Sequence, residues 1–321
     1  MRKGPQGSKG PRVRKGPEVR GSDRGQTRVR PLVASLLLAC CALAATLLSS
    51  IHAQAQGPSR IISLVPAVTE MLFAIGAGRQ VVAVSSYDRF PPEVDALPKV
   101  GALIDPDTER ILSLRPDLVV VYGSQNDVEA RFKKAGIRTF NYRHAATDAI
   151  LGTFDTIAAL GSATGHEAQA REIVVRITTG LDTTRKRVEG LSRPGSLLVI
   201  GRQPGTLQGI YVAGGSGFLN EILEVAGGQN VFEDVKRESV QPSSETLLRR
   251  APEVVLELHA TEPAGNYPGG ELGAWNTLAS IPAVRDHRVY SLVGDFVVVA
   301  GPRLAEGAEA IARTLHPDAF K

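Results

Sequence analysis

Cysteine is almost absent from this chain of 321 residues. Its two cysteines, Cys40 and Cys41, are adjacent and lie within an apolar stretch near the N-terminus. The rest of the sequence therefore has no thiol for a disulfide, a metal site or nucleophilic catalysis. Its stability must come from hydrophobic packing, and a chain of this length can bury one or two cores of adequate size.

Signatures of catalytic and nucleotide-binding sites are also missing. The sequence contains no G-x-S-x-G, G-x-x-x-x-G-K-[ST], G-x-G-x-x-G or H-E-x-x-H motif. The histidines after residue 55 are widely spaced, which favours packing or surface roles over a shared metal site. They are His144, His166, His259, His287 and His316. We therefore predict no catalytic residue, no metal site and no cofactor.

Positive charge is concentrated at the N-terminus. Residues 1–31 contain ten Lys or Arg and two acidic residues, whereas the whole chain has a formal charge of only +4. The sequence after residue 31 is therefore net acidic. We expect no nucleic-acid partner, because the basic residues belong to the leader and not to a folded surface.

The N-terminal segment has the three parts of a secretory signal peptide. The basic stretch is followed by an uncharged apolar run, Leu32 to Leu48, and by the small-x-small triplet Ala53-Gln54-Ala55. We predict that residues 1–55 are a signal peptide cleaved after this triplet and that the mature protein is periplasmic or otherwise exported. Two alternatives stay open: an uncleaved membrane anchor, and lipid attachment at the cysteine of Leu37-Leu38-Ala39-Cys40, which looks like a lipobox.

Short apolar runs alternate with segments of helical spacing after residue 55. The expected strands are 60–65, 81–84, 118–122, 137–141 and 196–201, and the expected helices between them are 69–75, 108–114 and 128–135. This alternation is typical of α/β architecture built on parallel sheets.

One long helical segment divides this α/β pattern into two halves. Residues 147–194 contain no expected strand, and residues 166–191 are predicted to form one long helix that ends before Arg193-Pro194-Gly195. We therefore predict an N-terminal lobe over 56–146, a helical linker over 147–194 and a C-terminal lobe over 195–321. A rigid connecting helix is expected to allow only small movements of the lobes.

The second half of the sequence repeats two segments of the first half in the same order. Thr69 to Gly78 corresponds to Asn220 to Gly228, and Thr108 to Val120 corresponds to Ser244 to Leu256. In the second pair the hydroxyl residue at the start is expected to cap a short helix, and a Pro-acid pair opens an apolar strand. The repeat indicates two similar Rossmann-like lobes with a ligand cleft between them.

Three tyrosines lie at expected strand ends or in loops, where α/β folds place their binding sites. They are Tyr87, Tyr122 and Tyr211. Their aromatic faces suit a large flat ligand, although tyrosines also pack in this way with a solvated hydroxyl and no ligand.

Three segments resemble a known class of proteins. They are Arg60 to Glu70 (RIISLVPAVTE), Val84 to Pro92 (VSSYDRFPP) and Glu109 to Val119 (ERILSLRPDLV). Together they resemble the helical-backbone (class III) periplasmic binding proteins, which serve importers of vitamin B12, iron-siderophores and haem. The likeness covers residues 58–316 and is greatest to the cobalamin-binding members. It implies a ligand such as cobalamin or another metal chelate held between two lobes, with no reaction catalysed.

The resemblance also implies which residues contact the ligand. They are Tyr87, Phe90, Leu103, Tyr122, Tyr211, Ser239, Asp295 and Phe296. Tyr87 matches a cleft tyrosine, and Asp295 with Phe296 matches an acid–aromatic pair that faces the ligand. Leu103 and Ser239 stand where cobalamin-binding members have tryptophans. This departure leaves a different corrinoid, a haem or a siderophore as alternative ligands.

Two further positions match residues that dock on the transporter in this class. Glu109 and Glu245 match glutamates on the lobe surfaces that pair with arginines of the membrane subunits. One acid on each lobe suits a twofold transporter. A glutamate in the first turn also favours the helix dipole, so a purely local role stays open. The expected partners are a small molecule and ABC importer membrane subunits, with the protein itself a monomer.

The sequence is thus interpreted as a periplasmic solute-binding protein that delivers a corrinoid to an ABC importer. An iron-siderophore or haem binding protein of the same class is the alternative. An exported two-lobed enzyme, such as a metal chelatase, would need a metal or acid–base constellation that the sequence does not supply. A surface adhesion module, which would have no small-molecule pocket, is a third interpretation.

Overall fold

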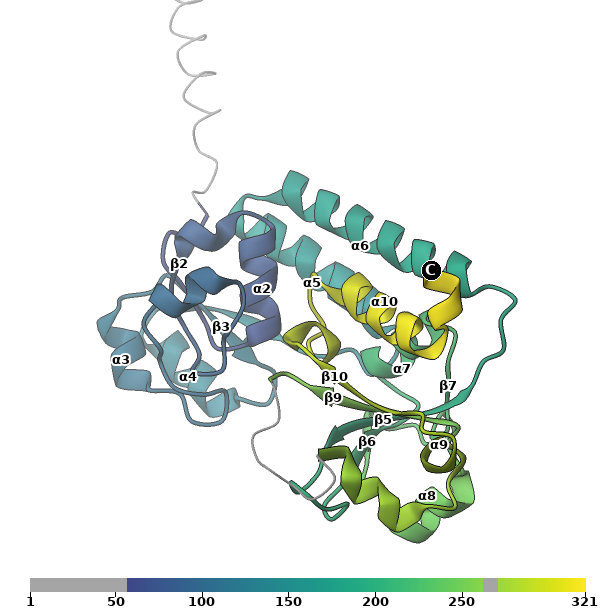
Figure 1. Ribbon diagram of the computed structural model, residues 1–321. Coiled ribbons are helices and arrows are strands. Elements are labelled where there is room, and N and C mark those ends of the chain that lie inside the picture. The colour runs from purple at the N-terminus through teal and green to yellow at the C-terminus, as the bar shows by residue number, and fades with distance from the viewer. Residues whose placement is uncertain (1–56, 262–270) are drawn as a thin grey trace, which may run out of the picture. The chain divides into compact units, whose positions relative to one another are not determined.

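Two mainly parallel β-sheets, each flanked by helices, organise the chain (Figure 1). The computed structural model describes residues 57–261 and 271–321. The predicted signal peptide, its cleavage site and Cys40 lie outside the described residues. Among the helices of the described part, none is long and apolar enough to cross a membrane.

The first sheet is four-stranded and entirely parallel, with the order β2-β1-β3-β4. Its strands are β1 Ile61–Ser63, β2 Val81–Val84, β3 Leu118–Tyr122 and β4 Arg138–Tyr142. The helices between them are α2 Pro66–Ala74, α3 Thr108–Ser113 and α4 Asn126–Lys134, with short 3₁₀ helices at Ala77–Gln80 and Pro92–Ala96. The predicted strands at 81–84 and 118–122 are confirmed to the residue.

The second sheet repeats this strand order. It contains β5 Gly195–Gly201, β6 Tyr211–Ala213, β7 Gln229–Asn230, β8 Ser239–Val240, β9 Val254–His259 and β10 Val289–Val293. Parallel pairing gives the order β7-β5-β9-β10, which corresponds strand for strand to β2-β1-β3-β4. The second sheet adds β6, which pairs antiparallel with β5, and β8, which pairs antiparallel with β6. Two lobes of similar topology are therefore confirmed.

The helices of the second sheet complete this repeat. They are α7 Phe218–Val225, α8 Ser244–Arg250, α9 Pro282–Arg285 and α10 Leu304–Leu315, with 3₁₀ helices at Glu271–Leu278, Asp295–Val297 and Pro317–Phe320. The helix α7 corresponds to α2, and α8 corresponds to α3.

Two helices, and not one, fill the segment between the sheets. They are α5 Ala149–Thr164 and α6 Glu167–Val188, separated by Gly165, whose φ of 78° ends the first helix. The longer helix, α6, matches the helix predicted over 166–191. It packs against both α5 and α10, which follow the last strand of the first and second sheet, respectively (Figure 1).

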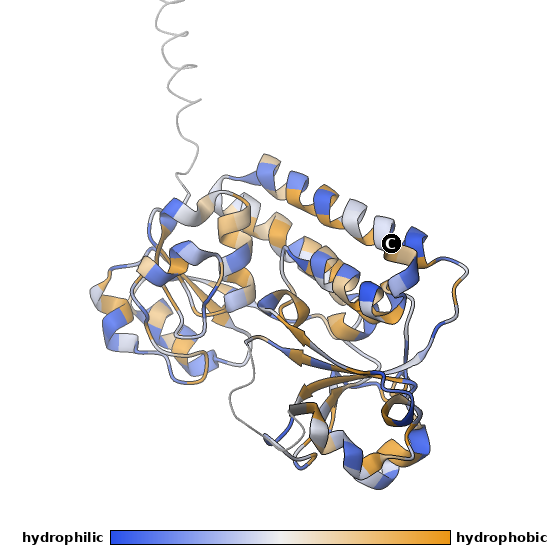
Figure 2. Ribbon diagram, viewed as in Figure 1, coloured by the Kyte–Doolittle hydropathy of each residue, from blue (hydrophilic) through white to orange (hydrophobic). Residues whose placement is uncertain are grey.

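One hydrophobic core is shared by the two lobes. It contains buried side chains from α2, α5, α6, α7 and α10, including Val68, Leu72, Ile157, Ile177, Ile222 and Ile311. Two smaller cores cover the other side of each sheet, one around Ile62 and Phe132 and one around Phe232 and Trp275. In Figure 2 the strands of both sheets are mainly hydrophobic, whereas α6 alternates hydrophilic and hydrophobic residues. Because α5 and α6 contribute to the shared core, the segment that connects the lobes is packed along its length, unlike a flexible linker.

The predicted helix caps of the repeated segment were wrong by one residue in each lobe. The caps are Asp107, which accepts from the backbone N–H of Arg110, and Ser243, which accepts from the backbone N–H of Thr246. Thr108 and Ser244, which were expected to cap, are the first helical residues, because the residue before each has the better-placed side-chain oxygen.

Candidate ligand-binding site

A cavity of about 270 Å³ lies at the carboxyl ends of strands from both sheets. Its lining includes Tyr87 and Phe90 after β2, Ala260 and Thr261 after β9, and Asp295 after β10. Loops at the carboxyl ends of parallel strands are the usual place for ligands in α/β folds. The arrangement of the two sheets therefore brings together three of the residues that the sequence predicted as ligand contacts, Tyr87, Phe90 and Asp295.

Buried hydrogen bonds fix the loop that carries Tyr87 and Phe90. The Ser85 hydroxyl donates to Asp88 Oδ2 at 2.6 Å, and Lys99 Nζ donates to the carbonyl oxygen of Asp88 at 3.0 Å. Burial raises the pKa of the Asp88 carboxyl, and the hydrogen bonds partly oppose that effect. Tyr87 itself is 61% exposed, so an anchored loop presents a largely open aromatic face to the cavity.

An ion pair between the lobes adjoins this cavity, which Glu70 lines. Arg303, just before α10, pairs with Glu70 of α2 through two hydrogen bonds, Nη2 to Oε1 at 2.6 Å and Nε to Oε2 at 2.9 Å. The guanidinium also lies 3.7 Å from the centre of the Phe90 ring, a cation–π contact. Burial raises the pKa of Glu70, Arg303 lowers it, and nearby Asp295 raises it further.

A second cavity, of about 310 Å³, is separated from the first by one short segment. It is lined by residues of β4 and its loop, α5, the start of α7, and β8. Val298 and Ala300 face this second cavity, whereas Val299 lines the first. Both volumes lie near the lower end of the ~300–1,000 Å³ range that is usual for ligand sites.

Tyr142 and His144 form an aromatic wall of the second cavity, and Tyr122 packs against them. The rings of Tyr122, Tyr142 and His144 lie 5.0–6.1 Å apart, and Tyr142 Oη is 3.1 Å from His144 Nδ1. Burial lowers the pKa of His144, and the Glu238 carboxylate opposes that shift. Burial also raises the pKa of the Tyr142 hydroxyl. The wall is therefore neutral near pH 7, with Glu238 at its edge as a hydrogen-bond acceptor.

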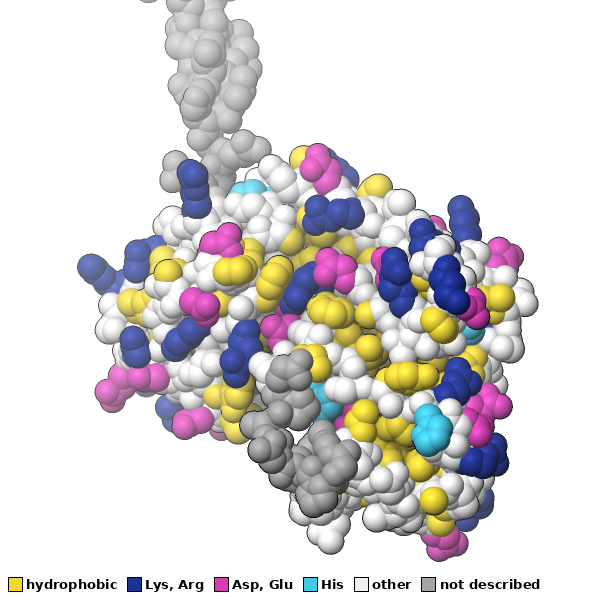
Figure 3. All heavy atoms as spheres, in the orientation of Figure 1, with side chains coloured by type: hydrophobic (Ala, Val, Ile, Leu, Met, Phe, Trp, Pro, Cys, Tyr) yellow, Lys and Arg dark blue, Asp and Glu magenta, His cyan; other side chains and the backbone are white. Residues whose placement is uncertain are grey.

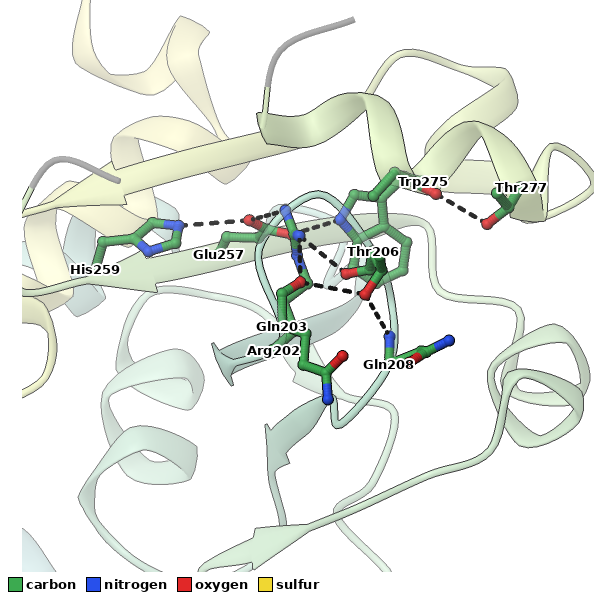
Figure 4. A network of polar contacts seen from close by, with 9 residues as sticks. Arg202, Gln203, Thr206, Gln208, Glu257, His259, Trp275 and Thr277 are labelled. Carbon is green, nitrogen blue, oxygen red and sulfur yellow. Dashed lines mark hydrogen bonds and ion pairs between the residues drawn. The ribbon is translucent and has the colours of Figure 1, made fainter. Parts of the chain in front are cut away.

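A buried charged network supports the second lobe from inside (Figure 4). Glu257 of β9 accepts hydrogen bonds from Arg202 Nε at 2.7 Å and from Trp275 Nε1 at 2.6 Å, and His259 Nε2 lies 3.4 Å from its other oxygen. The Arg202 and Glu257 side chains are only 3% and 1% exposed. Arg202 also donates to the carbonyl of Thr206, which fixes the turn after β5. The network thus holds the end of β9 directly before cavity residues Ala260 and Thr261.

The remaining predicted contact residues lie at different distances from the cavities. Ser239 lines the second cavity, and the ring of Tyr122 makes an edge contact with Tyr142 and a tilted contact with His144. Leu103 packs on the shared core, and its carbonyl accepts a hydrogen bond from Gln125. Tyr211, at the start of β6, is 47% exposed, and Phe296 packs near Arg303. Leu103, Tyr122, Tyr211 and Phe296 line neither cavity, and contact with a ligand stays a prediction for all eight residues.

Several cavity residues were not predicted from the sequence, namely Glu70, Arg89, Tyr142, His144 and Glu238, and neither was Arg303, which contacts two lining residues. Tyr142 ends β4 and His144 follows it, so the strand-end rule applied to the other tyrosines could have found both. Arg303 has no such signal, because its partner Glu70 is 233 positions away in the sequence.

The two glutamates predicted to dock on a transporter occupy equivalent places. Glu109 lies in the first turn of α3 and Glu245 in the first turn of α8, and both side chains are exposed. On the face drawn in Figure 3, Lys and Arg side chains are interspersed with Asp and Glu, without a continuous basic patch. Within residues 57–261 and 271–321, no group of three His, Cys, Asp or Glu side chains is placed to hold a metal.

Two sheets of repeated topology, a shared helical core and an inter-lobe cavity define a two-lobed binding protein. The chain belongs to the periplasmic binding protein family, whose model matches residues 61–295. The resemblance seen in the sequence is therefore confirmed at the level of the family.

Known proteins related to this chain differ in the ligands they are named for. An ABC transporter substrate-binding lipoprotein of Bacillus subtilis, YvrC, is 30% identical over 82% of each chain. A vitamin B12-binding protein of Yersinia pestis is 30% identical over 67% of this chain and 75% of that one. The crystal structure of a periplasmic haem-binding protein from Pseudomonas aeruginosa covers 81% of this chain and 94% of its own, with a TM-score of 0.70 and 24% identity, which shows the shared fold alone.

Proposed function

We propose that this chain is the substrate-binding protein of an ABC importer and that it captures a corrinoid between its two lobes. The observation that carries the proposal is the cavity that Tyr87 and Phe90 of one lobe line together with Asp295 of the other. The similarity to an ABC transporter lipoprotein and to a vitamin B12-binding protein supports both the transporter and the ligand class.

The chemistry of the two cavities suits a large planar ligand with amide side arms. Aromatic faces such as that of Tyr87 stack on a macrocycle. Asp295 and Glu238 offer carboxylate oxygens, which accept hydrogen bonds from amide N–H groups. A corrinoid carries such amides around its ring. A ligand that extends past the cavities would also reach the other proposed contacts, Leu103, Tyr122, Tyr211, Ser239 and Phe296.

A haem or an iron-siderophore is the second candidate. Arg89 lines the first cavity, and a guanidinium pairs well with the carboxylates that haem carries. The shared fold with a haem-binding protein is compatible with this ligand. Against it, Asp295 lines the same cavity, and its carboxylate disfavours an anionic ligand.

The location and the partner follow from the same proposal. Residues 1–55 would direct export and be cleaved after Ala55, with lipid attachment at Cys40 as the alternative. The mature lobes would be 56–146 and 195–321, joined by 147–194. The protein would act as a monomer, and Glu109 and Glu245 would pair with arginines on the two membrane subunits.

Titration calorimetry with residues 56–321 tests the proposal, using cyanocobalamin, haemin and a ferric hydroxamate as probes. We expect saturable one-site binding of cyanocobalamin, and at least about a tenfold loss of affinity in Tyr87→Ala because one stacking face is removed. Val175→Ala, which shortens an exposed apolar side chain of α6, is the control and should keep full affinity.

The alternatives give different results in the same titration. Binding of haemin or the hydroxamate without cyanocobalamin would replace the ligand but keep the class. Binding of none of the three, or equal affinity in Tyr87→Ala, would contradict the proposed site.

A further inference from the structure

Two glutamates occupy corresponding positions in the repeated halves of the chain. Glu70 lies in α2, which follows the first strand of the first sheet, and Glu221 lies in α7, its counterpart in the second sheet. Both belong to the repeated polar-Glu-apolar-Leu sequence, Thr69 to Leu72 and Asn220 to Leu223. Because both helices belong to the core shared by the lobes, their side chains can reach across the boundary.

Glu221 holds the start of α5. Its two carboxylate oxygens accept from the backbone N–H groups of Ala149 at 2.6 Å and Ile150 at 2.9 Å. The residue before the helix, Asp148, has a φ of 52° and makes no side-chain cap, so these N–H groups take their acceptor from the other lobe. A carboxylate at a helix N-terminus is also favoured by the helix dipole. The backbone N–H of Gly217 donates to the carbonyl of Ala146 at 3.0 Å beside it.

Glu70 holds the start of α10 in the reverse direction. It accepts two hydrogen bonds from the side chain of Arg303, the residue directly before α10. The Glu70 side chain is 4% exposed and that of Arg303 is 14% exposed, so water competes little for either group. The helices α5 and α10 are themselves equivalent, since each follows the last strand of its sheet.

We infer that Glu70 and Glu221 form a reciprocal pair of ties that hold the two lobes at a fixed spacing. Each glutamate reaches from the first helix of one lobe to the start of the helix that follows the last strand of the other lobe. The corresponding position of each repeat thus carries a glutamate that makes a tie. Glu70 reaches from the first lobe to the second, and Glu221 reaches from the second lobe to the start of α5.

The two ties differ in their contact with the cavity. Glu70 lines it, and the guanidinium of Arg303 stacks on Phe90, another lining residue. Glu221 lines neither of the two cavities described above. Arg303 is therefore a positioning residue, which links the spacing of the lobes to the orientation of Phe90. This step rests on the proposed function, because it concerns how the cavity receives a ligand.

Distances between the lobes test the ties. Residues 56–321 form one compact unit and contain no cysteine, so Lys134→Cys in α4 and Leu248→Cys in α8 give two sites for nitroxide labels. We expect one narrow distance distribution in the labelled parent. Broader distributions are expected in Glu70→Gln and Glu221→Gln, and the broadest in the double variant. Glu224→Gln, at an exposed position of α7, is the matched control and should leave the distribution narrow.

If Glu70→Gln does not fold, a conservative variant of its partner Arg303 tests the same tie. Arg303→Lys retains the positive charge but loses the paired hydrogen bonds and the flat stacking surface. It should broaden the same distribution. Distributions as narrow as the parent in Arg303→Lys, Glu221→Gln and every other folded tie variant would overturn the inference.

Amide exchange gives a second readout at the Glu221 tie. We expect exchange about tenfold faster at Ala149 or Ile150 in Glu221→Gln, because a hydrogen bond to a charged acceptor is lost or weakened. Unchanged exchange at both amides would contradict this tie.

Ligand affinity separates the positioning role from the ties. Arg303→Lys should weaken cyanocobalamin binding about tenfold, because the guanidinium contacts the ring of Phe90 in the first cavity. Glu221→Gln should weaken binding less, because Glu221 reaches the second cavity only through the backbone N–H of Ala149. Equal losses would contradict the positioning role. If the parent itself binds no cyanocobalamin, the proposed function fails, whereas the distance measurements still decide whether the ties exist.

Discussion

The two lobes share one strand order but bury their charges in different places. In the first lobe, the buried carboxyls of Glu70 and Asp88 lie beside the ligand cavity. In the second lobe, the buried carboxylate of Glu257 lies inside the lobe and is paired with Arg202 and Trp275. The repeated backbone therefore fixes where loops meet, and the side chains that differ decide which lobe supplies polar groups to the cavity.

The strand ends sharpen this comparison. His144 stands two residues after the end of β4, and Asp295 stands two residues after the end of β10. The equivalent positions line different cavities, one with a neutral ring and the other with a carboxylate. Equivalent positions of a duplicated fold can therefore give the two cavities between the lobes chemically different surfaces.

The largest effect is expected from breaking the charge network of the second lobe. Arg202→Met should lower the free energy of unfolding by about 3–5 kcal/mol, because it leaves the buried Glu257 carboxylate without its charged partner. Urea unfolding measures this loss. Arg249→Met, which removes an exposed partner of Glu245 in the same lobe, should change stability by less than about 0.5 kcal/mol. Equal effects of the two variants would contradict the structural role of the network.

The two glutamates proposed to dock on the transporter should contribute equally to docking. Glu109→Gln and Glu245→Gln should each weaken docking on the membrane subunits by about 2 kcal/mol, since each leaves an arginine of the transporter without its partner. Uptake of labelled ligand by cells would show the loss, with ligand affinity of the purified protein as the control. A drop in ligand affinity, or an effect from one glutamate only, would argue against paired docking.

The neutral wall of the second cavity predicts a pH dependence. The pKa of His144 is lower in the folded protein than its ordinary value of 6.5, so the unfolded chain binds the proton more readily. This contribution to stability is fully present above pH 6.5 and is lost as the pH falls toward the folded pKa, by at most about 1.4 kcal/mol per pH unit.

Replacing His144 tests that pH dependence. Between pH 7.5 and pH 4.5, the free energy of unfolding measured with urea should fall less steeply in His144→Gln than in the parent. Parallel curves for the parent and His144→Gln would show that His144 makes no such contribution.

The smallest effect is expected from the helix caps, which should behave alike in the two lobes. Asp107→Ala and Ser243→Ala should each lower the free energy of unfolding by about 1 kcal/mol, because each removes a side-chain acceptor for a backbone N–H. The neighbouring Thr108→Ala and Ser244→Ala serve as controls and should cost less. A larger loss in the controls would restore the caps first expected from the sequence.

Much of the fold could be predicted from the sequence because its signals are local. The apolar run of β3 and the proline that precedes it mark that strand without any tertiary information. The repeated segments predict two lobes, and the matching strand orders confirm them. The shift of each cap by one residue shows the limit of local signals: Asp107 and Thr108 are both good capping residues, and only the geometry selects between them.

The candidate site could be predicted only where a residue follows a strand. Tyr87 and Asp295 stand at strand ends, and the structure brings them to one cavity. The ion pair of Glu70 with Arg303 depends on packing between distant helices, so neither residue has a local signal for it. Glu221 likewise looks like an ordinary first-turn glutamate until its contact with α5 is seen.

The claim that one ligand is held by both lobes can be tested by hydrogen exchange of residues 56–321 with and without saturating cyanocobalamin. The proposed function predicts slower exchange in two segments together, residues 85–90 of the first lobe and residues 294–299 of the second, with Tyr87→Ala reducing both effects. Protection in one lobe only, or in neither, would contradict capture of the ligand between the lobes.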